Sequence, residues 1–245
     1  MTLTLQQPKL SFLFPENQVF IGQLKALDIR ISKDGIEKIE ANYTVVEEND
    51  IRPRLLPRDP FAHKGKMGNA LIIAGCYGMS GASVLATKGC LRVGAGKVTT
   101  HTPKRNSMIL QISVPEAVIQ FDREETIFSE AVDTEDFQAV GIGPGLGTSE
   151  QTAIAIIAQL RRTQCPLVAD ADAINILANH RAWLQQLPKG IILTPHPKEF
   201  DRLEGPSTDS FERLMKARDL AQRLQAYILL ISRSEERRVG KECRS

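Results

Sequence analysis

This 245-residue sequence has no long apolar run, no metal-type cysteine spacing and no strong net charge. No apolar stretch approaches the about 18–20 residues that a membrane-spanning helix needs. The N-terminus also lacks a basic region followed by an apolar one, which argues against a secretory signal peptide. The cysteines, at positions 76, 90, 165 and 243, show no metal-ligand spacing and are predicted to be free thiols. We therefore expect a cytoplasmic protein without a membrane partner.

The net charge of +2 comes from the last thirteen residues, so the rest of the chain sums to zero. This balance gives no reason to expect a nucleic acid as partner. The segment 233–245, RSEERRVGKECRS, resembles an in-frame translation of a common sequencing-library adapter. We expect that it is foreign to the protein and that the genuine sequence is interrupted near Ser232, after the apolar run Tyr227–Ile231. It is left out of the predictions of fold and function.

The chain predicts an unusual N-terminal segment, a linker and an α/β domain. In the first segment, Val19–Ile31 predicts a strand and Ser32–Ala41 a short helix, and the Pro- and Arg-rich residues 52–60 predict a linker. Strands are then predicted at Ala70–Ala74, Lys97–Thr102, Ala139–Ile142, Leu167–Ala169, Ile191–Thr194 and Tyr227–Ile231, and helices at Gly81–Val93, Ser149–Arg162 and Phe211–Ala226. Such alternation indicates a parallel sheet with helices on both faces, and ligands bind beyond the carboxyl ends of its strands.

Two glycine clusters follow predicted strands. Eight of the 17 glycines lie in His63–Thr102, where a strand, a glycine turn and a helix start could bind an anion or simply form turns. The second cluster, Gly141–Gly147 (GIGPGLG), could hold phosphate through main-chain N–H groups, including those of Gly143 and Gly147, or could be a structural turn. Thr148 and Gln151 have capping-box spacing for the next helix.

Polar side chains follow two further strands. Asp170 is expected in the crevice, where it could bind a metal–phosphate group, accept a proton or hold a ribose hydroxyl, whereas Asp172 is expected to cap a helix. Asn175 could contact either a ligand or a loop. His196 lies between two prolines that fix the backbone, so a ligand-binding role is favoured over a solvated loop histidine. His63 and Lys64 precede the first strand, where a structural role is favoured.

These segments together resemble one family closely. HKGKMGNALIIAG, GMSGASVLA, VGIGPGLG, VADADAINIL and ILTPHPKEF are similar to the NAD(P)H-hydrate dehydratases of the ribokinase-like superfamily, over about residues 60–231. The resemblance implies a three-layer α/β/α fold with a mostly parallel central sheet. It also implies dehydration of the S-form of hydrated NADH or NADPH (NADHX, NADPHX) with ADP or ATP as co-substrate and Mg²⁺ as cofactor. By motif, Ala82, Gly145 and His196 should contact the hydrated nucleotide.

Residues 1–51 resemble the last part of an NAD(P)H-hydrate epimerase domain, which precedes the dehydratase in bifunctional members of the family. This resemblance predicts an epimerase remnant at 1–51, the linker at 52–60 and an incomplete dehydratase domain at 61–232. For the intact parent it implies a homo-oligomer, and a K⁺ site in the epimerase domain.

The chain departs from the family pattern after its last predicted strand. The family continues there with a Lys-Gly segment that binds adenine nucleotide and later a Gly-Ser-Gly-Asp loop that supplies the base. This chain has Ile231-Ser232 instead, and no Gly-x-Gly-Asp occurs in it. We therefore expect a C-terminally incomplete domain that lacks the catalytic base and is inactive as given. The alternatives are a small-molecule kinase of the same superfamily and an inactive nucleotide-binding module.

Overall fold

The computed structural model describes residues 1–55, 61 and 63–231. The chain forms two compact units, Met1–Pro60 with Ser207–Leu214 (the N-terminal unit) and Phe61–Pro206 with Met215–Ser245 (the main unit). The last part of the predicted linker and the adapter-like tail lie outside the described residues. The inclusion of Ser207–Leu214 in the N-terminal unit is not anticipated by the sequence, because these residues follow the dehydratase-like motifs.

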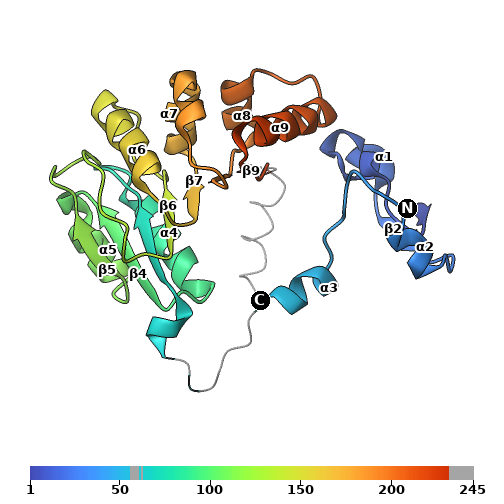
Figure 1. Ribbon diagram of the computed structural model, residues 1–245, viewed down its shortest axis with the longest axis horizontal. Coiled ribbons are helices and arrows are strands. Elements are labelled where there is room, and N and C mark those ends of the chain that lie inside the picture. The colour runs from blue at the N-terminus through green and yellow to red at the C-terminus, as the bar shows by residue number, and fades with distance from the viewer. Residues whose placement is uncertain (56–60, 62, 232–245) are drawn as a thin grey trace. The chain divides into compact units, whose positions relative to one another are not determined.

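The main unit is built on a seven-stranded sheet in which every pairing is parallel (Figure 1). Its order is β5-β4-β3-β6-β7-β8-β9. The strands are β3 (Asn69–Ile73), β4 (Lys97–Thr102), β5 (Val118–Phe121), β6 (Ala139–Ile142), β7 (Leu167–Ala169), β8 (Ile192–Leu193) and β9 (Tyr227–Ile228). The predicted α/β class and parallel sheet are confirmed. The sequence analysis missed β5, which is short, largely exposed and at the sheet edge, and so lacks the continuous apolar run of a buried strand.

The strand order reverses at β3. The chain first builds outward to β4 and β5 on one side, and then returns to place β6 on the other side of β3. The register sets Ile73 opposite both His101 and Ile142, so the three strands end at the same level. In an open α/β sheet this reversal leaves a crevice outside the carboxyl ends of the two diverging strands.

Helices cover both faces of the sheet. The right-handed rule for parallel crossovers puts α4 (Ser80–Arg92) and α5 (Ser107–Ser113) on one face. The same rule puts α6 (Glu150–Arg162), α7 (Asp172–Asn179) and α9 (Ser210–Leu224) on the other, and α8 (Pro197–Glu204) packs against α7. Figure 1 shows α6, α7 and α8 in a row along one side of the sheet. Single-turn helices lie at Lys64–Met67 and Lys104–Asn106, and a longer 3₁₀ segment at Arg181–Gln186.

Helix α6 corrects two details of the prediction. Ser149 is its N-cap and accepts a hydrogen bond from the Thr152 main-chain N at 3.2 Å, so the predicted capping box of Thr148 and Gln151 is wrong by one residue. The apolar side chain predicted at Ile154 is 57% exposed, whereas Ile156 is fully buried in the core cluster. The later helix start rotates the buried stripe toward Ile156 and away from Ile154.

The N-terminal unit contains a parallel pair of strands, β1 (Thr2–Leu5) and β2 (Leu24–Leu27). Its helices are α1 (Gln18–Ile21), α2 (Lys33–Glu37) and α3 (Glu48–Ile51), with 3₁₀ turns at Leu10–Leu13, Pro15–Asn17 and Arg52–Arg54. The predicted helix within Ser32–Ala41 is confirmed. The single strand predicted over Val19–Ile31 is wrong, because α1 occupies its start and ends at Gly22, whose φ of +59° suits glycine.

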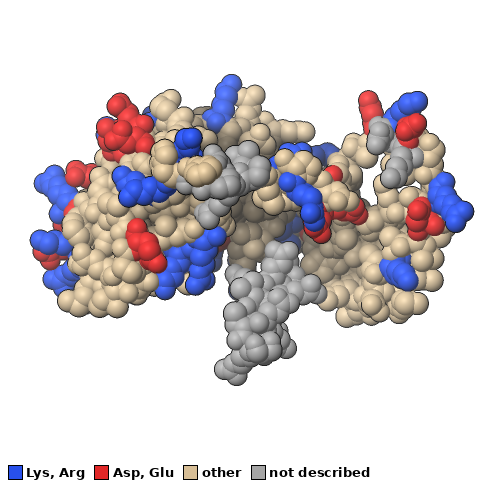
Figure 2. Space-filling view, turned by 90° about the horizontal axis from the view of Figure 1, so that it is seen from below, with Lys and Arg blue, Asp and Glu red and all other residues tan. Residues whose placement is uncertain are grey.

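No helix in the described part of the chain is long and apolar enough to cross a membrane. On the face drawn in Figure 2, Lys and Arg side chains occur close to Asp and Glu side chains. This mixture agrees with the near-zero charge sum of the sequence outside its last thirteen residues.

Helix α6 offers a matched test of the core. We expect Ile156→Ala to lower the free energy of unfolding by about 2–5 kcal/mol, because it leaves a cavity in the core. The control Ile154→Ala removes the same atoms from a largely exposed side chain of the same helix and should change that energy by less than about 1 kcal/mol. Urea unfolding followed by circular dichroism measures both, and equal effects would contradict the assigned burial.

Candidate functional site

Two loops meet where β3 and β6 end. We call residues 74–82 the first loop and Gly141–Gly147 the glycine loop. The Gly75 main-chain N donates to the Pro144 carbonyl at 2.8 Å, and the Gly143 N donates to the Ile73 carbonyl at 3.2 Å. These reciprocal bonds hold the loops side by side at the reversal of strand order. The predicted glycine clusters therefore line one crevice, as the parallel-sheet argument requires.

Gly145 lies against the start of helix α4. Its φ is +63°, and a Cβ at this position would lie 2.7 Å from the Ala82 Cβ and 3.1 Å from the Met79 carbonyl oxygen. Only glycine combines this conformation with so close an approach. The structure thus brings together Ala82 and Gly145, two of the three residues predicted to contact substrate. Their contact with a ligand stays a prediction.

Gly143 is buried against the main chain of Asp170. Its φ is +131°, and a Cβ here would overlap the Asp170 carbonyl oxygen. The Asp170 side chain is half-buried, and its carboxylate forms no hydrogen bond or ion pair within the described residues. This carboxylate at the carboxyl end of β7 is therefore available to a ligand, as predicted from its position after the strand. A ligand contact has not been observed for it.

Asp172 is not the helix cap that the sequence analysis expects. Ala171 occupies the N-cap of α7, and Asp172 is the first helical residue. The Asp172 carboxylate instead accepts hydrogen bonds from the Gly147 main-chain N at 2.9 Å and from Asn175 Nδ2 at 3.2 Å. The cap prediction fails because Ala171 takes a φ of +48°, so the chain turns before Asp172 and not after it.

His196 is the N-cap of α8. Its Nδ1 accepts a hydrogen bond from the Lys198 main-chain N at 3.2 Å, and the Glu199 carboxylate accepts one from the His196 N at 2.9 Å. Because Nδ1 is an acceptor, the proton of a neutral ring lies on Nε2, which can donate to a ligand. His196 thus has a structural task that the sequence analysis does not anticipate, and this task leaves its outer nitrogen for binding.

The predicted residues follow the sheet edge in series. Ala82, Gly145, Gly143 and Asp170 cluster around β3, β6 and β7, whereas His196 follows β8, the next strand. His63 precedes the turn Lys64–Met67 at the amino end of β3, and the Lys64 carbonyl packs against Gly96. The position of His63 and Lys64 therefore agrees with the structural reading of both.

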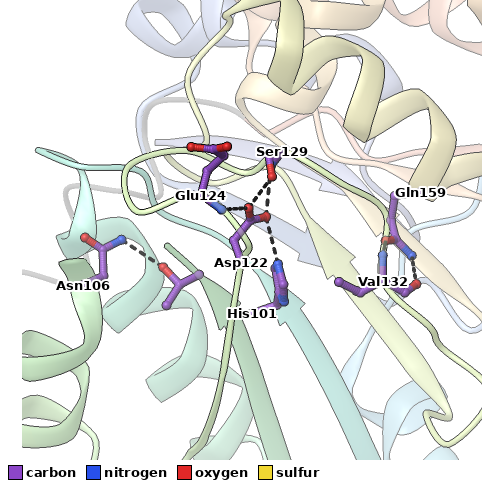
Figure 3. A network of polar contacts seen from close by, with 8 residues as sticks. His101, Asn106, Asp122, Glu124, Ser129, Val132 and Gln159 are labelled. Carbon is purple, nitrogen blue, oxygen red and sulfur yellow. Dashed lines mark hydrogen bonds and ion pairs between the residues drawn. The ribbon is translucent and has the colours of Figure 1, made fainter. Parts of the chain in front are cut away.

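A buried pair that the sequence analysis missed supports the rim of the crevice (Figure 3). His101 Nε2 lies 3.1 Å from Asp122 Oδ2, and both side chains are almost completely buried. Asp122 also accepts hydrogen bonds from the main-chain N of Ser129 and of Glu124, at 2.9 Å each, and from the Ser129 hydroxyl. No spacing in the sequence links a histidine in one strand to an aspartate beyond the next, so only tertiary structure identifies this pair.

The bonds to Asp122 order the loop of residues 122–129 that touches the first loop. The Thr126 carbonyl accepts from the Tyr77 main-chain N at 2.8 Å, and the Glu125 carbonyl accepts from the Arg105 N at 3.2 Å. Burial by itself would raise the pKa of Asp122, but the hydrogen bonds from His101, Ser129 and Glu124 outweigh it and hold that pKa below its ordinary value. The ionised carboxylate is therefore part of the native rim.

Cys76 lies in the first loop with its thiol buried. Burial raises the pKa of Cys76, and the nearby negative charge of Asp172 raises it further. A thiol in this state is a poor nucleophile at neutral pH. Cys76, Cys90 and Cys165 are free thiols, as predicted, and Cys243 lies outside the described residues.

Within the described segments, no group of three His, Cys, Asp or Glu side chains is arranged to hold a metal ion. Mg²⁺ commonly keeps several waters and binds one or two carboxylates together with substrate phosphates. Asp170 is the crevice carboxylate that fits such a partial role.

Residues 70–235 match the NAD(P)H-hydrate dehydratase family. The chain is 30% identical over 242 residues to the bifunctional NAD(P)H-hydrate repair enzyme Nnr of Moorella thermoacetica, covering 94% of this chain and 45% of that protein. It is 31% identical over 192 residues to the ADP-dependent (S)-NAD(P)H-hydrate dehydratase of Streptococcus thermophilus, covering 78% of this chain and 68% of that protein. The chain spans less than half the length of the bifunctional relatives.

The main unit also resembles solved structures. One is the ADP/ATP-dependent NAD(P)H-hydrate dehydratase of Bacillus subtilis, co-crystallised with ATP and Mg²⁺. The TM-score is 0.64 at 32% identity, covering 76% of this chain and 65% of that one. A ribokinase-like protein of Enterococcus faecalis, at 24% identity and a TM-score of 0.60, shows the same fold. The predicted ribokinase-like fold is therefore confirmed.

Asp122 predicts an acid-sensitive contribution to stability. Its pKa is lower in the folded chain than in the unfolded chain, so its contribution is complete at neutral pH and is lost as pH falls through the lowered value, below about pH 4. Asp122→Asn should lower the free energy of unfolding at pH 7 by about 1–3 kcal/mol and flatten its decline on acidification. The exposed control Asp136→Asn should leave that decline unchanged. Urea titrations at several pH values measure both, and a parallel decline in the Asp122 variant would refute the assignment.

Proposed function

The chain belongs to the NAD(P)H-hydrate dehydratase family, and we propose that its main unit binds the S-form of NADHX or NADPHX for ADP-dependent dehydration. The observation that carries this proposal is the contact between Ala82 and Gly145 at the reversal of strand order. These are the residues that the family resemblance assigns to the hydrated nucleotide, and they lie in the crevice where an open parallel sheet binds its ligands.

The chemistry that we propose suits a site built mainly for positioning. The ring hydroxyl of the hydrate is a poor leaving group. Its oxygen would attack the β-phosphorus of ADP, the bond between that phosphorus and the bridging oxygen would break, and AMP would leave. Phosphate would then leave the ring carbon while the adjacent carbon gives up a proton, which restores the reduced nicotinamide. Such phosphoryl transfer depends on orientation and charge stabilisation.

In this proposal each described residue has a limited task. Gly145 and Ala82 allow close approach of the nucleotide, and His196 donates from Nε2. Asp170, and the main chain around Gly143 and Gly147, would lie nearest the phosphates. ADP or ATP would bring Mg²⁺ bound to its phosphates, with Asp170 as the single carboxylate that could add a ligand.

We further propose that the base which takes the ring proton is outside residues 61–232. The support is the sequence, in which no Gly-x-Gly-Asp occurs. A chain of this composition should bind substrate without completing the dehydration. For residues 1–51 we propose an epimerase remnant, with K⁺ a property of the parent's epimerase domain. Alignment over 94% of this chain in the bifunctional relative, against 78% in the dehydratase of Streptococcus thermophilus, supports that origin.

For the whole protein we propose a cytoplasmic homo-oligomer. The free thiols Cys76, Cys90 and Cys165 support a reducing compartment. Exposed Met108 and Ile112 on α5, close in sequence to edge strand β5, support self-association, because such apolar surface and unpaired strand edges favour protein contacts.

Titration calorimetry of the full chain with hydrated NADPH and with ADP tests the proposed function, combined with recovery of the reduced nicotinamide absorbance. We expect binding of both ligands without turnover. Turnover would overturn the missing base and leave the dehydratase function standing. Failure to bind hydrated NADPH would overturn the proposed function, and phosphorylation of a small alcohol would favour a kinase instead.

His196 allows capping and ligand binding to be separated. His196→Ala should lower the free energy of unfolding by about 1 kcal/mol, through loss of the α8 cap, and should weaken hydrated NADPH binding about tenfold. His196→Asn keeps a good N-cap but loses Nε2, so it should restore stability and not affinity. Calorimetry and urea unfolding of both variants measure this. Full affinity in the Asn variant would exclude a ligand contact through Nε2.

Gly145 gives a second test of the binding wall. Gly145→Ala adds a methyl group that meets Ala82 in a backbone conformation unfavourable to alanine, and should weaken hydrated NADPH binding at least tenfold. The control Gly89→Ala lies in α4 with open space around it and should raise the free energy of unfolding by about 0.5–1 kcal/mol without changing affinity. Equal affinities in calorimetry would argue against the proposed wall.

A further inference from the structure

Helices α7 and α8 are joined to the glycine loop by a chain of side-chain hydrogen bonds. Asp172 Oδ2 accepts from the Gly147 main-chain N, and Asp172 Oδ1 accepts from Asn175 Nδ2. Asn175 Oδ1 in turn accepts from Arg202 Nη1 at 2.6 Å. Arg202 belongs to α8, the helix that begins after His196. The chain therefore runs from the glycine loop to the helix that carries the predicted substrate histidine.

This arrangement decides which main-chain donors the glycine loop can offer. The Gly143 N is used by the Ile73 carbonyl and the Gly147 N by the Asp172 carboxylate. The Gly145 N makes no hydrogen bond to another described residue. A ligand anion at Gly147 would have to displace a carboxylate and meet its negative charge, whereas Gly145 is free of both costs.

The backbone next to Asp172 carries strain that needs support. Ala171 has φ +48° and ψ −114°, a conformation that suits glycine at the first central position of a type II′ turn. A non-glycine residue persists there only where its surroundings hold it. The bonds of Asp172 to Gly147 and Asn175 supply such support immediately after the strained residue.

We propose that Asp172, Asn175 and Arg202 are positioning residues that fix the glycine loop with the Gly145 N–H toward the ligand and couple this loop to α8. The ligand-binding part of this proposal rests on the proposed function, whereas the coupling itself is a property of the ligand-free chain. It also revises the predicted phosphate contact at Gly147, whose N–H serves Asp172.

Hydrogen exchange of the full ligand-free chain, read at the Gly147 amide by NMR, tests the coupling. Asp172→Ala should raise the Gly147 exchange rate about tenfold or more and shift its amide resonance upfield, because a charged acceptor is lost. Core amides of α6, such as that of Leu160, should keep their exchange rates and show that the fold is intact. An unchanged Gly147 amide in this variant would overturn the proposal.

Arg202→Met provides the readout that a purely local role of Asp172 would not move. Arg202 makes no contact with Gly147 in the chain of bonds above, yet we expect this variant to raise Gly147 exchange about two- to fivefold through Asn175 and Asp172. Arg161→Met, an exposed arginine on α6, is the matched control and should have no effect. If both arginine variants behave alike, the coupling to α8 is refuted.

Calorimetry with hydrated NADPH tests the ligand-binding part. Asp172→Ala should weaken binding about tenfold, and Asp172→Asn should recover part of that loss, because an amide oxygen still accepts from Gly147. Equal affinity of wild type and Asp172→Ala would overturn the positioning role. If wild type does not bind at all, the proposed function fails, while the exchange measurements still decide the coupling.

Discussion

The reversal of strand order at β3 is the constraint on which the rest of the main unit depends. It separates the carboxyl ends of β3 and β6 from a continuous covering of crossovers, and the bonds between Gly75 and Pro144 and between Gly143 and Ile73 then join the two loops across that point. Glycine is needed there because main chain packs on main chain, at Gly143 against Asp170 and at Gly145 against the α4 start. The crevice follows from topology, and its wall follows from the glycines.

Charged groups around this wall act mainly by holding main chain in place. Asp122 orders the loop 122–129 beside Tyr77, and Asp172 holds the Gly147 end of the glycine loop. Asp170 differs from both, because its carboxylate forms no bond within the described residues. Three aspartates near one crevice thus have different tasks, which are set by their hydrogen-bond partners and not by their distance from the strand ends.

Local patterns in the sequence were sufficient for much of the fold. The strands Lys97–Thr102, Ala139–Ile142 and Leu167–Ala169 have the predicted bounds, because short apolar runs between glycine or proline residues admit few other interpretations. Patterns failed where a residue has a partner far along the chain. His101 and Asp122 belong to different strands, and Asp172 reads as a cap until Ala171 turns the backbone before it.

The sequence by itself determined the parallel α/β class, the family and the positions of Gly145, Asp170 and His196 at strand ends, because these depend on local apolar period and on residue types next to strands. Tertiary structure alone decided that Ala82 meets Gly145, that His196 caps α8 through Nδ1, and that Gly147 is held by Asp172. Each of these depends on atoms brought within hydrogen-bond or van der Waals distance by the packing of separate elements, and local sequence carries no record of that distance.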